Sequence, residues 1–124
     1  MKTKRAKIKG IVRKDTQELE HFQNSVLRPI LKGQHELLIQ SFQNYLEQRK
    51  IDFSNIKTEQ KENHINSILS KDIAYKNLQI GMIIGQFTTE EFELYKLHSG
   101  EYNKRILQML KKRLKDTLIG ETHS

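Results

Sequence analysis

Clustered basic side chains are the feature of this 124-residue chain that most directly suggests a chemistry. Residues 1–14 contain seven lysines and arginines and no acidic residue: Lys2, Lys4, Arg5, Lys7, Lys9, Arg13 and Lys14. A stretch with this much charge cannot bury enough apolar surface to fold alone. We therefore expect a disordered arm. Such an arm neutralises phosphates and releases counterions, which predicts salt-sensitive binding to RNA or DNA. The alternative is a tail that only aids solubility.

The arm accounts for the whole net charge of the chain. There are 22 lysines and arginines against 15 acidic residues, which gives +7. Removing the arm leaves 15 residues of each sign over residues 15–124. The sequence therefore predicts a basic arm (1–14) and a formally neutral single domain (15–124).

A second set of basic residues lies in the predicted helix 101–119. At about 100° per residue, its apolar residues occupy one half of the helical wheel. The opposite sector holds Lys104, Arg105, Lys111, Lys112 and Lys115. Arg113 falls among the apolar positions, so it must snorkel or find a partner. A polar outer face is ordinary for such a helix, so this set indicates nucleic-acid contact less strongly than the arm does.

The patterns of common enzymes and metal sites are missing from the sequence. Cysteine is absent, and none of the five histidines has HxH or HxxxH spacing. The motifs GxSxG, HExxH and the P-loop are also absent. We therefore assign no catalytic residue, no metal and no cofactor, and expect a non-enzymatic protein. His35, on the apolar side of its helix, is expected to be partly buried and hydrogen-bonded.

Helical periodicity dominates the body of the chain. Apolar residues recur at spacings of three and four, and Pro29 is the only proline. This predicts an all-α fold, a single bundle of four to six helices. We expect helices over 15–27, 29–50 and 101–119, with Pro29 opening the second of them.

Between residues 51 and 100 the boundaries are less defined. A linker over 51–57 precedes a helix that Thr58 caps. Thr88 and Glu91 match a capping box, so a short helix should follow, with Phe92 and Tyr95 inward. The stretch 58–87 is one helix or two.

Residues 78–84 are apolar nearly all round, which favours a central helix and leaves a buried strand as the alternative. Gly81 and Gly85 would share a helical face and allow a neighbouring helix to approach closely.

Membrane insertion is not indicated. The basic start lacks the apolar run of about 7–15 residues of a signal peptide. The most apolar stretch, Leu78 to Phe87, is about half of the roughly 20 residues that a spanning helix needs. We expect a soluble, cytoplasmic protein without a transmembrane segment.

Several stretches resemble small proteins of flavobacteria and related Bacteroidetes that carry the label glyoxalase. The likeness covers residues 22–116, leaves the arm outside, and is clearest at GMIIGQFT (81–88) and NKR (103–105). It implies a small bacterial cytoplasmic protein and, through the label, a metal-dependent lyase. Known glyoxalases use metal ligands on βαβββ units or an HxHxDH cluster. This sequence has neither, so no catalytic residue is carried over.

Three functions follow from these observations. The first is a non-enzymatic module that contacts RNA, DNA or a ribosome-like surface through the arm. The second is a protein-interaction or self-association module with an exposed apolar groove. The third is the glyoxalase-type lyase of the label.

Overall fold

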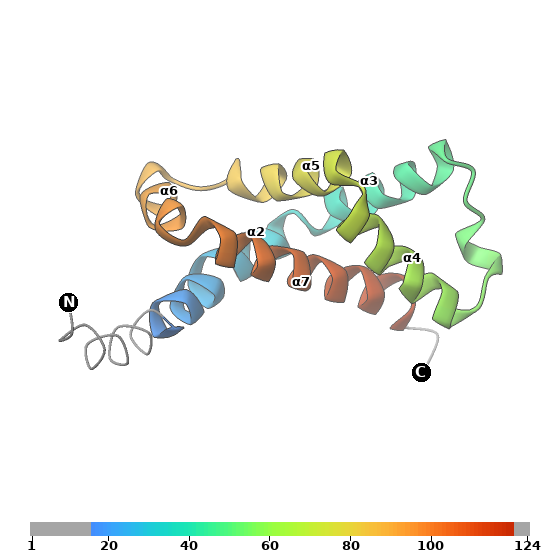
Figure 1. Cartoon of the computed structure of the whole chain (residues 1–124), viewed down its shortest axis with the longest axis horizontal. Coiled ribbons are helices and arrows are strands. Elements are labelled where there is room, and N and C mark those ends of the chain that lie inside the picture. The colour runs from blue at the N-terminus through green and yellow to red at the C-terminus, as the bar shows by residue number, and fades with distance from the viewer. Residues whose placement is uncertain (1–15, 121–124) are drawn as a thin grey trace, which may run out of the picture.

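The computed structural model describes residues 16–120; the basic arm lies outside this range. Every regular element within 16–120 is a helix, which confirms the all-α prediction. The longest helix, α7 (Ser99–Leu118), runs along much of the molecule (Figure 1). It packs against α4 (Thr58–Lys71) and α5 (Ile73–Ile84), and the buried apolar side chains form one cluster.

The chain enters through one helical stretch rather than through two separate helices. Residues 16–22 continue into a π-helical turn, η1 (Gln23–Leu27), and then into α2 (Arg28–Gly33). Pro29 lies in the first turn of α2, as predicted, but no interruption precedes it, because Leu27 and Arg28 both keep right-handed helical angles. A proline cannot donate to the carbonyl four residues back and collides with it in an ideal α-helix. The π turn just before Pro29 is wider than an α-helical turn, because the Arg28 N–H donates to the carbonyl of Gln23, five residues back. The wider turn makes room for the proline ring.

The predicted helix 29–50 is divided in two. Gln34 has φ −96° and ψ 4°, which separates α2 from α3 (His35–Gln48) directly after Gly33, a poor helix former. Helix α3 buries one apolar face. Its buried residues are Leu38, Phe42, Tyr45 and Leu46.

A kink at Asp72 settles the 58–87 stretch as two helices. Asp72 has φ −86° and ψ 94°, and its carboxylate caps α5 by accepting from the Tyr75 N–H at 3.1 Å. The same carboxylate accepts from the Tyr45 hydroxyl at 2.6 Å and lies 3.5 Å from the Arg49 guanidinium. The strand alternative for 78–84 is wrong, as is the cap at Thr58, because α4 already begins at that residue.

Asp72 should make the stability of the fold depend on acid pH. The hydrogen bond from Tyr45 is the main cause that holds the pKa of the Asp72 carboxyl below its ordinary value, helped by the Tyr75 N–H and by Arg49. A pKa lowered by folding gives stability that is present above the unfolded pKa and is lost as pH falls through the folded one.

We expect the native chain to be more stable than Asp72→Asn at pH 7. This advantage should shrink as pH falls below about 4, where the carboxyl of the unfolded chain is protonated. Urea unfolding at several pH values measures it. Asp116→Asn, at an exposed pair with Lys112, is the matched control and should show little change. An Asp72→Asn deficit that is constant from pH 7 to pH 2 would contradict the assignment.

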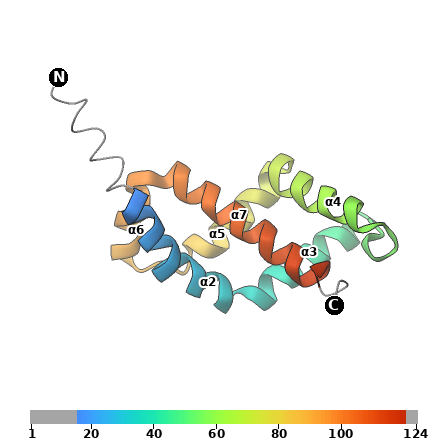
Figure 2. The same cartoon turned by 90° about the horizontal axis from the view of Figure 1, so that it is seen from below.

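Helix α5 is not the centre of the bundle, contrary to the prediction. It buries one face through Tyr75, Ile80, Ile83 and Gln79, while Leu78 is 54% exposed. Gln79 can lie inward because its side-chain amide donates to the Tyr75 hydroxyl at 2.8 Å and to Ser41 Oγ at 2.9 Å. The predicted close approach at Gly81 is also wrong, since a Cβ there would meet open space. Helix α7 lies between α2 and α4 instead (Figure 2).

The capping box before α6 (Thr89–Tyr95) is confirmed. Thr88 Oγ1 accepts from the Glu91 N–H at 3.0 Å, and the Thr88 N–H donates to Glu91 Oε1 at 2.8 Å. Tyr95 is buried as predicted, but Phe92 is 42% exposed rather than inward. A short 3-10 turn, η3 (Lys96–His98), links α6 to α7.

Candidate functional site

Two of the basic residues predicted on α7 contact neighbouring elements, one on each side of their sector. On one side, Arg105 Nη1 donates to Gln23 Oε1 of η1 at 2.9 Å. On the other, Lys111 Nζ donates to Ser70 Oγ of α4 at 2.9 Å. Lys104 and Lys112 are exposed and Lys115 is half-buried. Lys104 and Lys112 are eight residues apart, or about 12 Å along the helix. The five residues share the outer sector of α7, in which Arg105 and Lys111 have partners in neighbouring elements.

A basic groove lies on the η1 side of α7, between that helix and the 23–28 segment. It has a volume of about 390 Å³. Its lining residues are Gln23, Arg28, Gln108, Met109, Lys112, Arg113, Asp116 and Thr117. Three side chains in this groove are cationic and one is a carboxylate, so its net charge is positive. Of the residues predicted on α7 it contains Lys112, and Arg105 adjoins it through Gln23.

Sequence reasoning missed Arg28 and placed no function on Arg113. Arg28 is an isolated basic residue in the sequence, separated by 84 positions from Lys112, so only tertiary packing brings them together. Arg113 was expected to snorkel or find a partner, and its partner is His35, with Arg113 Nη1 and His35 Nδ1 3.2 Å apart. The expectation of a partly buried, hydrogen-bonded His35 is confirmed by the same contact.

The cations of the groove keep donors for a ligand. Arg28 uses its Nε to donate to Asn24 Oδ1 at 2.8 Å, and Lys112 lies 3.1 Å from Asp116. A guanidinium has five N–H donors and an ammonium group has three, so each contact occupies only part of the hydrogen-bonding capacity of Arg28 or Lys112. An exposed lysine–carboxylate pair is weak and exchanges readily for another anion. The groove can therefore bind phosphate or carboxylate oxygens.

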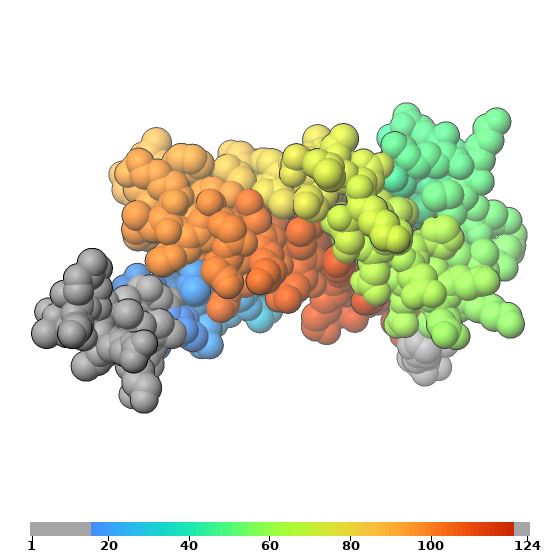
Figure 3. Space-filling model, viewed as in Figure 1, coloured from blue at the N-terminus to red at the C-terminus, as the bar shows by residue number. Residues whose placement is uncertain are grey.

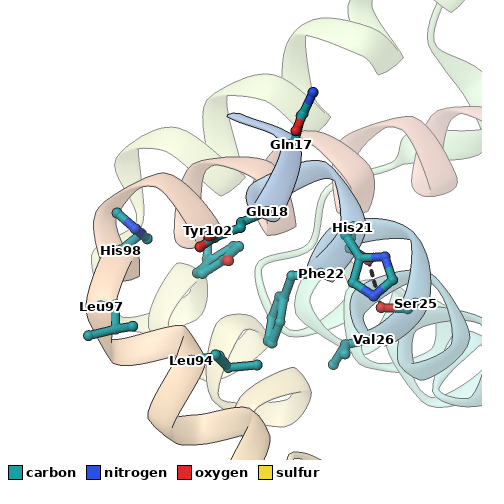
Figure 4. A pocket seen from close by; sticks show the side chains of 10 residues that line it. All are labelled: Gln17, Glu18, His21, Phe22, Ser25, Val26, Leu94, Leu97, His98 and Tyr102. Atoms are coloured by element: carbon teal, nitrogen blue, oxygen red, sulfur yellow. Dashed lines mark hydrogen bonds between the residues drawn. The ribbon is translucent and has the colours of Figure 1, made fainter. Parts of the chain in front are cut away.

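A larger and more apolar cleft lies near the start of the described chain. It has a volume of about 630 Å³ and separates residues 17–26 from α6, η3 and the start of α7. Figure 4 shows Phe22 and Leu94 directed into this space from its two walls. The orange residues of α6 and early α7 lie above the blue first helix in the space-filling view (Figure 3).

The segments that form this cleft are acidic. Residues 16–26 contain Glu18 and Glu20 and no lysine or arginine. Residues 88–102 contain one lysine, Lys96, which pairs with Glu93 at 3.0 Å, and four acidic residues: Glu90, Glu91, Glu93 and Glu101. The two stretches that form the cleft therefore carry a net negative charge, and Glu18 is the carboxylate that lines the cleft itself.

The described residues do not fit the metal that a glyoxalase-type lyase requires. Within 16–120, no three His, Cys, Asp or Glu side chains come together as a ligand set. His21, His98 and Glu18 all line the apolar cleft, but they do not converge as a ligand set.

No helix in the described range is both long and apolar enough to cross a membrane. Comparison of the chain with protein-family models, curated proteins and solved structures finds no match.

Proposed function

We propose that this protein is a non-enzymatic binding module that contacts RNA, DNA or a ribosome-like surface through its basic arm and the basic groove. The observation that carries the proposal is the convergence of Arg28, Lys112 and Arg113, from two helices, around a groove with a single carboxylate. The arm adds seven basic residues without an acidic one. Together they supply cations from parts of the chain far apart in sequence.

The chemistry of the groove suits phosphate groups in a chain. Guanidinium groups bind phosphate oxygens in a bidentate manner, and lysine adds a compact positive charge. Contacts of this kind fix the position of a nucleic acid without reading its bases. The expected binding is therefore strong at low salt and weakly dependent on sequence.

The groove is tested by a pair of double variants that change the net charge equally. Arg28→Gln with Lys112→Gln removes two groove cations, whereas Lys57→Gln with Lys71→Gln removes two exposed lysines at the two ends of α4. Each phosphate contact contributes about 0.9 to the slope of log affinity against log salt, so the groove variant should lose about 2 units of slope and on the order of 10-fold in affinity. Fluorescence anisotropy with a labelled RNA hairpin or DNA duplex measures both quantities.

The control variant should bind within about twofold of the native chain because its lysines lie away from the groove and their neutralisation affects only screened, long-range attraction. Equal losses in the two variants would contradict a role for the groove and would assign binding to overall charge. Unfolding curves of both variants check that the fold is retained.

A protein-interaction module is the second candidate, and the apolar cleft favours it. The proposed setting for either function is the bacterial cytoplasm. The lyase of the label gains no support from the described residues, for which no metal-ligand set is found.

A further inference from the structure

The apolar cleft has an aromatic floor and an open rim. Its floor is built from the rings of Phe22 and Tyr102, whose centroids are 4.4 Å apart. On its rim, Leu94 is 53% and Leu97 is 65% exposed. Large apolar side chains gathered beside a cavity are characteristic of surfaces that bind another chain segment. The cleft therefore fits a segment that carries aliphatic side chains.

The charge of the two stretches that form the cleft indicates which kind of segment it would bind. The two stretches that form the cleft, 16–26 and 88–102, together carry six carboxylates and one lysine. Glu18 lines the cleft itself. A basic occupant would be attracted to this end of the molecule and an acidic one repelled. The occupant should combine lysines or arginines with aliphatic residues.

The chain itself supplies such a segment at the right place. Residues 1–14 contain Ile8, Ile11 and Val12 interspersed among the seven basic residues. The described chain begins at Thr16, one residue before Gln17, which lines the cleft. Fourteen residues can extend over about 46 Å, which is ample for a chain that must reach a cavity beginning beside its point of attachment.

We propose that the cleft binds the chain's own arm, residues 1–14, in the same molecule. The aliphatic side chains of the arm lie against Phe22, Leu94 and Leu97. Its lysines and arginines face Glu18 and the other carboxylates of the two stretches that form the cleft. An arm held in this way is withdrawn from phosphates, so a nucleic acid must displace it. This last consequence rests on the proposed function, whereas the docking does not.

Paramagnetic relaxation enhancement in the full chain tests the docking. The chain has no cysteine, so Thr3→Cys provides a single site for a nitroxide label. We expect strong broadening of the methyl resonances of Val26 and Leu94 in the cleft, and little at Leu37 or Leu78, which lie on α3 and α5. Adding Leu97→Ser, at an exposed position, should reduce the broadening at Val26 and Leu94 about fivefold, because an apolar contact is lost.

Two outcomes would overturn the proposal. Broadening that is unchanged by Leu97→Ser would mean that the arm only passes near the cleft. The second outcome comes from a mixture in which one set of chains carries the isotope label and the other set carries the nitroxide. If the broadening in this mixture is as strong as when both labels are on the same chain, the cleft binds the arm of a second copy.

Addition of an RNA hairpin then separates docking from polyanion binding. Loss of the broadening as the hairpin binds supports displacement of the arm. Binding that leaves the broadening unchanged would refute the displacement, and a hairpin that does not bind would refute the proposed function. Neither result alters the docking measured without RNA.

Discussion

Replacing all seven lysines and arginines of residues 1–14 by glutamine should weaken binding to a generic RNA or DNA more than any change in the groove. These residues are seven of the 22 basic residues in the chain and have no acidic neighbour within the arm. If each contacts one phosphate, the slope of log affinity against log salt should fall in magnitude by up to about 6. At about 0.1 M salt we expect an affinity loss of at least 100-fold. Anisotropy titrations at several salt concentrations measure both.

The length of the arm is unchanged in this variant, so the effect reports its charge. The buried cluster is formed by residues between Leu19 and Ile119, so the variant should still unfold cooperatively, with a urea midpoint lowered only by the contacts that the docked arm makes with the cleft. An affinity within about threefold of the native value would contradict the assignment of binding to the arm, because the loss of even one phosphate contact exceeds this at 0.1 M salt.

Phe42→Ala should cause the largest loss of stability among single substitutions on α3. The Phe42 side chain is fully buried, with ring centroids 6.0 Å from Phe53 and 6.4 Å from Tyr75. It therefore joins α3 to both the 53–55 turn and α5. Removal of a buried phenyl ring leaves a cavity and costs about 3–5 kcal/mol. Urea denaturation should show this as a reduced free energy of unfolding.

Leu37→Ala is the matched control on the same helix. Leu37 is 55% exposed, so its truncation should change the free energy of unfolding by less than about 0.5 kcal/mol. A domain of ordinary stability, about 5–15 kcal/mol, would survive the first variant only with a large part of its margin removed. Similar losses in the two variants would mean that the buried and exposed faces of α3 are assigned incorrectly.

The helices with a regular apolar period were predictable from the sequence. In α7, Tyr102, Ile106, Leu110 and Leu114 repeat every four residues and all are buried. The capping box at Thr88 was equally visible because both partners lie within four residues. Local periodicity and capping are sufficient where a helix has one apolar face.

Other features depend on contacts that the sequence does not reveal. Gln79 is polar but buried, since Ser41 and Tyr75 satisfy its amide, so the inward face of α5 could not be identified from hydrophobicity. Leu78 is apolar but exposed, so hydrophobicity alone wrongly places it inside the fold. The helical course through Pro29 depends on a π turn, which has no simple residue signature.

The candidate site was predictable in part. The arm and Lys112 were identified from charge, but the groove needs Arg28 and Arg113, and their proximity is a product of tertiary packing. Likewise, the sum of charges over 15–124 is zero and conceals two stretches, 16–26 and 88–102, that carry six carboxylates and one lysine. The apolar cleft likewise depends on tertiary packing, which brings residues 16–26 and 88–102 together as its two walls.

The most direct test of polyanion binding is a salt titration of the full, unmodified chain with a labelled RNA hairpin and a DNA duplex of similar length. We expect tight binding at 50 mM salt to both probes and a linear loss of affinity of roughly 10³-fold or more by 200 mM, as six or more phosphate contacts require. Absence of binding at 50 mM salt, or an affinity that does not change with salt, would contradict the proposed function.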